Sequence, residues 1–393
     1  MPAQNTPQSF GTVARTFHWL TALLILTAIP LGVIANRLPY DTAEALATKA
    51  QLFSIHKTIG VAAFLIALGR IGWAMTQTRP VPLHPDRKAE VSLGDAVHWL
   101  LYISLLAVPL TGWIHHAAVT GFAPILWPFG QTLPFVPQSE RVAAVFAAGH
   151  WVFTKLLAAA ILLHIAGAVK HHLIDRDDTL RRMWRGKVAP ANPAPKLHAR
   201  APLLAAIVIY AAGAGIAGLL VPPTAAPAAE APVVAMAGNW LVTQGTLTFG
   251  VRQIGSDVQG SFRTWAADID FDEANGTGDV SVTIDTTSMT LGSVTKQAAE
   301  PEFFDITAHP TATFAAAITP AADGYLADGT ITLRGIVKPL SLPFTLTLAG
   351  DTATMAGQTT IDRRDFGMGP SYPDEASVGF AVTVDVALTA TRQ

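Results

Sequence analysis

Five long apolar segments in the first 221 residues constrain this 393-residue chain more than any other feature. They run over 17–36, 53–74, 95–118, 146–170 and 201–221. Each is long enough to cross a bilayer as a helix, which takes about 20 residues. Only 14% of the residues are charged, whereas soluble domains carry about 25%. We therefore expect a multi-pass membrane protein, with the lipid bilayer as its first partner.

The charges divide the chain into two regions. Residues 1–236 hold 18 Lys and Arg against 10 Asp and Glu, and residues 237–393 hold 8 against 18. Basic residues gather in the connections 75–94 and 170–200, which predicts that both connections are cytoplasmic. An inside N-terminus and five crossings then place everything after residue 221 outside. The chain has no cysteine, which excludes disulfides, thiolate zinc sites, iron–sulfur clusters and covalently attached c-type haem.

The amino-acid composition and the hydrophobic pattern change after the fifth segment. Residues 222–237 are rich in Pro and Ala and are expected to form an extended linker. Residues 238–393 show short alternating apolar runs, which are typical of an antiparallel sandwich or barrel. The expected turns are Asn275-Gly276, Asp323-Gly324, Asp328-Gly329 and Gly350-Asp351. A barrel of about eight strands can hold one small apolar ligand or be filled by its own side chains, and the alternation leaves both possibilities open.

Four histidines in the apolar segments suggest a redox function. His150 and His164 are 14 residues apart, so they share a helix face and lie about 21 Å apart along the axis. In the expected orientation His56 is level with His150 near the outside, and His18 is level with His164 near the inside. Two facing imidazole pairs are what two six-coordinate haems b need. The alternative is that each histidine is a structural residue bonded to a neighbour or to lipid headgroups.

Two further histidines lie near the inner pair. His171 follows His164 by seven residues, which is two helical turns, and is a candidate for proton delivery or quinone contact. His98 in the third segment is a weaker candidate for a fifth haem-pocket residue, because no partner at its depth is evident. No nucleic-acid partner is expected.

The motifs of the first region resemble the bacterial cytochrome b561 family. These motifs are RTFHWL at 15–20, IHKTIG at 55–60, the pair His150 and His164, KHH at 170–172 and DTLRRM at 178–183. The resemblance covers about residues 10–187. It implies an all-α four-helix transmembrane bundle that carries two haems b, exchanges electrons with membrane quinone and, in some relatives, takes them from superoxide. It assigns the haem-iron ligands as His18 and His164 on the inner haem and His56 and His150 on the outer one.

The last region is similar to the YceI family over residues 239–393. The similarity rests on GSF at 260–262, PEFFDI at 301–306, HPTATF at 309–314, LRGIVKPL at 333–340 and RRDFGM at 363–368. It implies an all-β lipocalin-like antiparallel barrel that binds isoprenoid lipids, including quinone-type tails. Candidate lipid-binding residues of the lumen are Phe303, Phe304, Phe314, Phe344, Phe366 and Phe380.

Together these patterns predict a membrane di-haem b cytochrome in a bacterial inner membrane, joined through a fifth span and a linker to a periplasmic barrel. It would be an electron-transfer protein or a quinone-linked oxidoreductase, with quinone or a polyprenoid lipid as partner and a donor and acceptor that the sequence does not identify. The alternative is a membrane-anchored isoprenoid carrier without a redox role. A third interpretation makes the barrel an interaction domain for another periplasmic protein.

Overall fold

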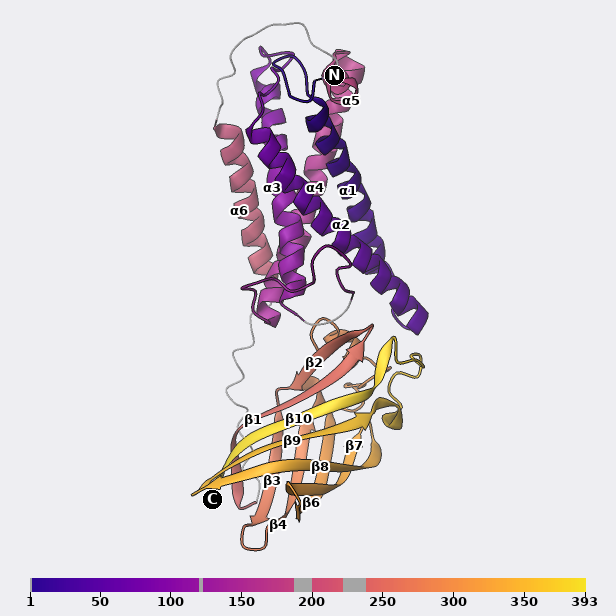
Figure 1. The fold of residues 1–393 in the computed structure, drawn as a ribbon, viewed down its shortest axis with the longest axis vertical. Helices are drawn as coiled ribbons and strands as arrows, with labels where there is room; N and C mark the ends of the chain where they lie inside the picture. Colours follow the sequence, from indigo (N-terminus) through magenta and orange to yellow (C-terminus); the bar gives the residue numbers. More distant parts are fainter. Residues whose placement is uncertain (1, 120–122, 187–199, 222–237) are drawn as a thin grey trace. The chain divides into compact units, whose positions relative to one another are not determined.

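The computed structural model describes residues 2–119, 123–186, 200–221 and 238–393. The linker expected at 222–237 lies outside the described residues. The chain divides into two compact units, one helical and one built on strands, and each is described by itself. Together they confirm the predicted class of fold, in which apolar helices are followed by an antiparallel barrel (Figure 1).

Within the described residues, the helical unit contains five helices that are long and apolar enough to cross a membrane. They include or coincide with α1 (Thr12–Arg37), α2 (Ala43–Met75), α3 (Lys88–Ala117), α4 (Glu140–Lys170) and α6 (Ala201–Leu220). A short π-helical turn, η1 (His171–Asp175), continues α4, and α5 (Thr179–Arg185) follows it. The first four helices are longer than the apolar segments because polar turns extend them. α4, for example, begins where the Ser139 hydroxyl accepts a hydrogen bond from the backbone N–H of Val142, an N-cap that satisfies an otherwise unpaired amide.

Helix α6 is packed against α3 and α4 (Figure 1). Its buried residues recur every three or four positions and are Pro202, Ala206, Tyr210, Gly213 and Ala217. The Tyr210 hydroxyl is hydrogen-bonded to the Ser104 hydroxyl of α3, and a β-carbon at Gly213 would lie 3.0 Å from Leu156 Cδ1 of α4. Small residues and a hydroxyl pair are the usual means of close helix association in lipid. The fifth helix is therefore an integral part of the bundle, in addition to joining it to the barrel.

The strand unit is a closed antiparallel barrel. Its eight strands pair in the order β1 (Trp240–Gln253), β10 (Val378–Arg392), β9 (Thr352–Asp362), β8 (Ile336–Ala349), β7 (Gly324–Leu333), β6 (Thr311–Ala321), β4 (Thr277–Asp285) and β3 (Trp265–Asp272), and β3 pairs with β1 again. Two shorter strands continue the sheet outside the barrel: β2 (Ser256–Phe262) pairs with the second half of β1, and β5 (Met289–Thr290) pairs with β2. Closure leaves no long exposed edge.

Three of the four expected turn dipeptides join neighbouring strands. Asn275-Gly276, Asp323-Gly324 and Gly350-Asp351 link β3 to β4, β6 to β7 and β8 to β9, and each of these glycines has a positive φ. The prediction for Asp328-Gly329 is wrong. Gly329 lies inside β7, where it pairs with Ala316 and Leu340, and a β-carbon there would meet Ala315 O at 2.0 Å. The glycine therefore permits close strand approach rather than a turn.

Candidate functional site

Two imidazoles face each other between α2 and α4 and define site 1. The ring centroids of His56 and His150 lie 6.3 Å apart. His56 Nδ1 is 2.8 Å from the carbonyl oxygen of Ala28, and His150 Nδ1 is 2.9 Å from that of Val108. A carbonyl oxygen only accepts, so each Nδ1 must carry the proton and donate. Both rings are thereby fixed in the tautomer that leaves Nε2 with its lone pair, as in a metal-ligating histidine.

A glycine lies against each ring of site 1. A β-carbon at Gly32 of α1 would be 2.8 Å from His56 Cε1, and one at Gly112 of α3 would be 2.9 Å from His150 Nδ1. Any other residue would push the rings out of place. These two glycines are positions of site 1 that the sequence analysis missed.

Site 2 lies between α1 and α4. The ring centroids of His18 and His164 are 6.0 Å apart, and His98 of α3 lies beside them, 5.2 Å from the His164 ring. His98 Nδ1 is 2.7 Å from Gly94 O on its own helix. His98 is thus a third imidazole of site 2, whereas sequence reasoning assigned it no partner.

The same spacing in the sequence relates site 1 to site 2 on each of the helices α1 to α4. Each helix carries one residue per site, 14 positions apart: His18 and Gly32 on α1, Arg70 and His56 on α2, His98 and Gly112 on α3, and His164 and His150 on α4. Fourteen residues make almost four turns and about 21 Å, so both positions share a helix face. The sequence analysis used this spacing on α4 alone; applied to the other helices, it would have found Gly32, Arg70 and Gly112.

The two pairs fit bis-histidine haem. A metal ion bound by two imidazole nitrogens, each at about 2.0 Å, would require ring centroids about 6.3 Å apart, and the observed separations are 6.3 and 6.0 Å. Gly60 and Gly167 lie about one turn after His56 and His164 on the same helices, and a β-carbon at either glycine would meet no atom within 4 Å. The donor set, the fixed tautomers of site 1 and the glycines are therefore all compatible with one haem at each site.

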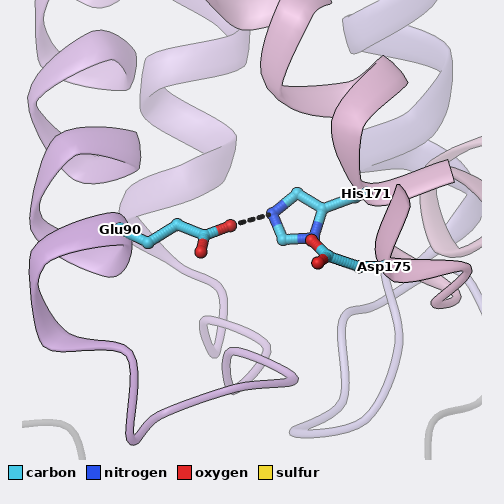
Figure 2. A group of neighbouring side chains, drawn as sticks. All are labelled: Glu90, His171 and Asp175. Atoms are coloured by element: carbon cyan, nitrogen blue, oxygen red, sulfur yellow. Dashed lines mark ion pairs between the residues drawn. The ribbon is translucent and has the colours of Figure 1, made fainter. Parts of the chain in front are cut away.

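His171 belongs to a charged network at the end of the bundle that carries site 2. Its Nδ1 is 2.7 Å from Asp177 Oδ2, and its Nε2 is 3.2 Å from Glu90 Oε1 (Figure 2). His84 Nε2 contacts the same Asp177 oxygen at 3.1 Å, and the two imidazoles are stacked with centroids 6.4 Å apart. Burial raises the pKa of Asp177, but hydrogen bonds from Thr179 and His171 outweigh it and hold the pKa below its usual value.

Three side chains near this end of the bundle lie close enough to share a metal ion: Glu90, His171 and Asp175 (Figure 2). Both carboxylates, however, already form ion pairs with basic side chains. Lys170 Nζ is 2.5 Å from Glu90 Oε1 and 2.8 Å from Asp175 Oδ2. Arg87 Nη1 is 2.9 Å from Asp175 Oδ1. An ammonium group between the two carboxylates opposes a further cation there. The group is therefore an ion-pair network rather than a metal centre.

The barrel encloses an elongated apolar cavity. It is lined by residues of all eight barrel strands, and along β8 it extends from Leu340 to Leu348, which is about 26 Å of strand. Among the described residues that line it, no side chain is charged. Such a lumen suits a long hydrocarbon chain and offers nothing to hold a polar headgroup.

The six phenylalanines proposed for the lumen fall into two groups. Phe314 and Phe344 line the cavity. Phe303, Phe304 and Phe366 pack in or against the apolar core without lining it. Phe380 also does not line it, and the Arg364 guanidinium carbon lies 3.8 Å from its ring centroid.

A bundle of apolar helices with two facing histidine pairs, followed by a closed apolar barrel, is the architecture of a membrane cytochrome joined to a lipocalin-like domain. Residues 9–186 match the family model of prokaryotic cytochrome b561, and residues 241–390 match that of the YceI-like domain. Each region therefore matches the family that its sequence motifs predicted.

Curated relatives match each region separately. Cytochrome b561 homolog 2 of Escherichia coli is 27% identical over 47% of this chain and 95% of its own length. A probable superoxide oxidase of Yersinia pestis is 26% identical over 43% of this chain and 92% of its own. A UPF0312 protein of Pectobacterium atrosepticum is 32% identical over 33% of this chain and 74% of its own.

Among solved structures, Burkholderia cenocepacia BcnA is 30% identical, covering 37% of this chain and 96% of its own, with a TM-score of 0.36.

Proposed function

We propose that the helical unit is a di-haem b electron carrier. The match to the cytochrome b561 family implies haem b, and the observation that supports two of them is the pair of imidazole separations, 6.3 Å at site 1 and 6.0 Å at site 2. In this proposal His56 and His150 hold one haem, and His18 and His164 hold the other. Haem held by two imidazoles would supply one-electron, outer-sphere transfer.

The chain's own contribution is to hold the ligands and to limit their movement. Ala28 and Val108 carbonyls fix the site 1 tautomer, while Gly32 and Gly112 let α1 and α3 approach the rings closely. The apolar helices keep water from both sites. Such rigidity reduces the reorganisation that accompanies a change of charge.

We infer that quinone exchanges electrons at the end of the bundle near site 2 and that His171 handles the accompanying proton. Support comes from its position between Glu90 and Asp177, with a carboxylate at each ring nitrogen. Replacing His171 by Gln should slow quinone turnover while the haem spectrum stays unchanged. Unaltered turnover would contradict this role.

For the membrane arrangement we propose a bacterial inner membrane with a cytoplasmic N-terminus and a periplasmic barrel. The Lys and Arg excess in the connections 75–94 and 170–200 supports this orientation. Reporter fusions after residues 40 and 80 should give opposite signals, and equal signals would contradict it.

A second function is proposed for the barrel, because its cavity is lined without any charged side chain among the described residues. The barrel binds the isoprenoid chain of a quinone or polyprenoid lipid and leaves the headgroup outside. Organic extraction of the purified protein, followed by mass spectrometry, tests this; a barrel that carries no lipid after expression in a lipid-replete host would contradict it. Lipid binding without haem would favour a membrane-anchored carrier.

The test of the main proposal is a reduced-minus-oxidised spectrum with haem counted per chain. We expect about two haems b, one lost in a His56 or His150 variant and the other in a His18 or His164 variant. Absence of haem after haem-replete expression would overturn the redox function.

A further inference from the structure

Arg70 occupies the α2 position of site 2. It lies 14 residues after His56 on the same helix and therefore on the same face, about 21 Å further along. The Tyr102 ring, which its guanidinium contacts, lies one turn after His98 of site 2 on α3. The arginine is thus a component of the site 2 pocket.

This guanidinium has no carboxylate partner in the part of the chain that the structure describes. Its recorded contact is with the Tyr102 ring of α3, whose centroid is 5.4 Å from the guanidinium carbon. An arginine inside a membrane-spanning helix is costly and is normally paired. An oxyanion from outside the described chain would satisfy it.

A second donor lies one turn away. Trp73 follows Arg70 by three residues, which places both on one helix face. The Trp73 indole Nε1 is buried and has no hydrogen-bond partner among the described residues. Buried N–H groups are rarely left unpaired, so this donor indicates a missing acceptor within a turn of Arg70.

We infer that Arg70 and Trp73 bind a carboxylate of the haem at site 2, which rests on the proposed di-haem function. Haem b carries two propionate groups, and a guanidinium fork with an indole N–H offers the planar charged and neutral donors that a carboxylate accepts. A lipid phosphate has similar oxyanion chemistry. Site 2 favours the haem because Arg70 occupies the α2 position of that site, level with the two proposed ligands His18 and His164.

The test compares Arg70→Gln with Arg79→Gln in the full chain. Arg79 follows α2 and its guanidinium lies over Trp99, so its variant loses the same charge near the same helix end. Haem per chain is counted first, and both midpoint potentials are measured by spectroelectrochemistry in nanodiscs. Because a nearby cation favours the reduced haem, Arg70→Gln should lower one midpoint potential and leave the other at its wild-type value. Arg79→Gln should shift neither.

Trp73→Phe supplies the second variant, since it keeps an aromatic ring and removes only the N–H. It should lower the potential of the same haem by less than Arg70→Gln does, and it replaces that variant if Arg70→Gln holds fewer haems than the wild type.

Reconstitution with haem dimethyl ester distinguishes the two sources of the oxyanion. Without propionate charge, the Arg70→Gln effect should shrink. An effect of unchanged size that instead follows the anionic lipid content would assign Arg70 to lipid phosphate and overturn the inference, as would equal potentials in Arg70→Gln and Arg79→Gln. A wild type without haem would overturn the proposed function itself, so the two failures are distinguishable.

Discussion

The imidazole of His56 rests directly on Gly32, where a β-carbon would come within 2.8 Å of Cε1. The ring cannot easily withdraw, because its Nδ1 donates to Ala28 O on the same helix as the glycine. Any side chain larger than the hydrogen of Gly32 would therefore displace the His56 ring. Gly112 has the same relationship to His150.

Gly32→Ala is expected to cost about 1–3 kcal/mol of stability through overpacking and to reduce haem at site 1 while site 2 keeps its haem. The haem count per chain measures the loss of haem, and low-temperature spectra identify the site that loses it. Gly72→Ala on α2 is the matched control, because a β-carbon there meets no atom within 4 Å. Equal haem content in the two variants would show that close packing against the ring is unimportant.

Arg363 should be a main stabilising residue of the barrel. Its guanidinium is buried and donates to five backbone carbonyls: those of Gly379, Met368, Gly369, Tyr372 and Val378. Arg363→Met leaves these acceptors without donors and should lower the free energy of unfolding by about 3 kcal/mol or more. Arg364→Met, at an exposed arginine, should cost much less. Denaturant titration of barrel fluorescence checks the difference.

Met355→Trp should block the cavity of the barrel. Met355 lines the lumen on β9, and a larger ring there would occupy the space available to a hydrocarbon chain. Thr354 is the exposed neighbour and points to the opposite face, so Thr354→Trp adds the same ring outside. Less co-purified lipid in Met355→Trp than in Thr354→Trp is expected, and equal amounts would argue against lipid in the lumen.

The turn after β9 should respond to acid. A hydrogen bond from Arg364 lowers the pKa of Asp362, and Asp362 also accepts from the Arg364 backbone N–H at 2.9 Å. Its contribution, about 0.5–1 kcal/mol, is fully present above its unfolded pKa of about 4 and is lost as the pH falls through the lower folded value. Hydrogen exchange in η3 (Arg363–Phe366) should be faster in Asp362→Asn than in the wild type at pH 6, with the difference shrinking as the pH approaches 3.

Removing the Tyr210 hydroxyl should loosen α6. Tyr210→Phe deletes its hydrogen bond to Ser104, which within a membrane is worth about 0.6 kcal/mol. Gly213→Leu, which forces a larger side chain towards Leu156, should be more damaging. Thermal stability in detergent measures both, and a Gly213→Leu protein as stable as the wild type would contradict the close packing of this helix.

Sequence reasoning predicted what depends on pattern within one segment. Apolar length predicted the five helices, alternation predicted an antiparallel sandwich or barrel, and the spacing of His150 and His164 indicated two levels in the bundle. Sequence reasoning failed for residues whose role depends on a contact with a different helix or strand. Gly32 is meaningful only because α2 presents His56 to it, and Gly329 was mistaken for a turn because its partners, Ala316 and Leu340, come from other strands.

The repeated spacing of 14 residues constrains how such a bundle can change over time. Inserting one residue between His18 and Gly32 would turn one end of α1 relative to the other by about 100° and shift it by about 1.5 Å. Only one of the two residues could then keep its place, Gly32 at site 1 or His18 at site 2. The four stretches between the two levels can therefore exchange apolar side chains freely but cannot change length. The connections between helices carry no such restriction, so insertions and deletions should accumulate there alone.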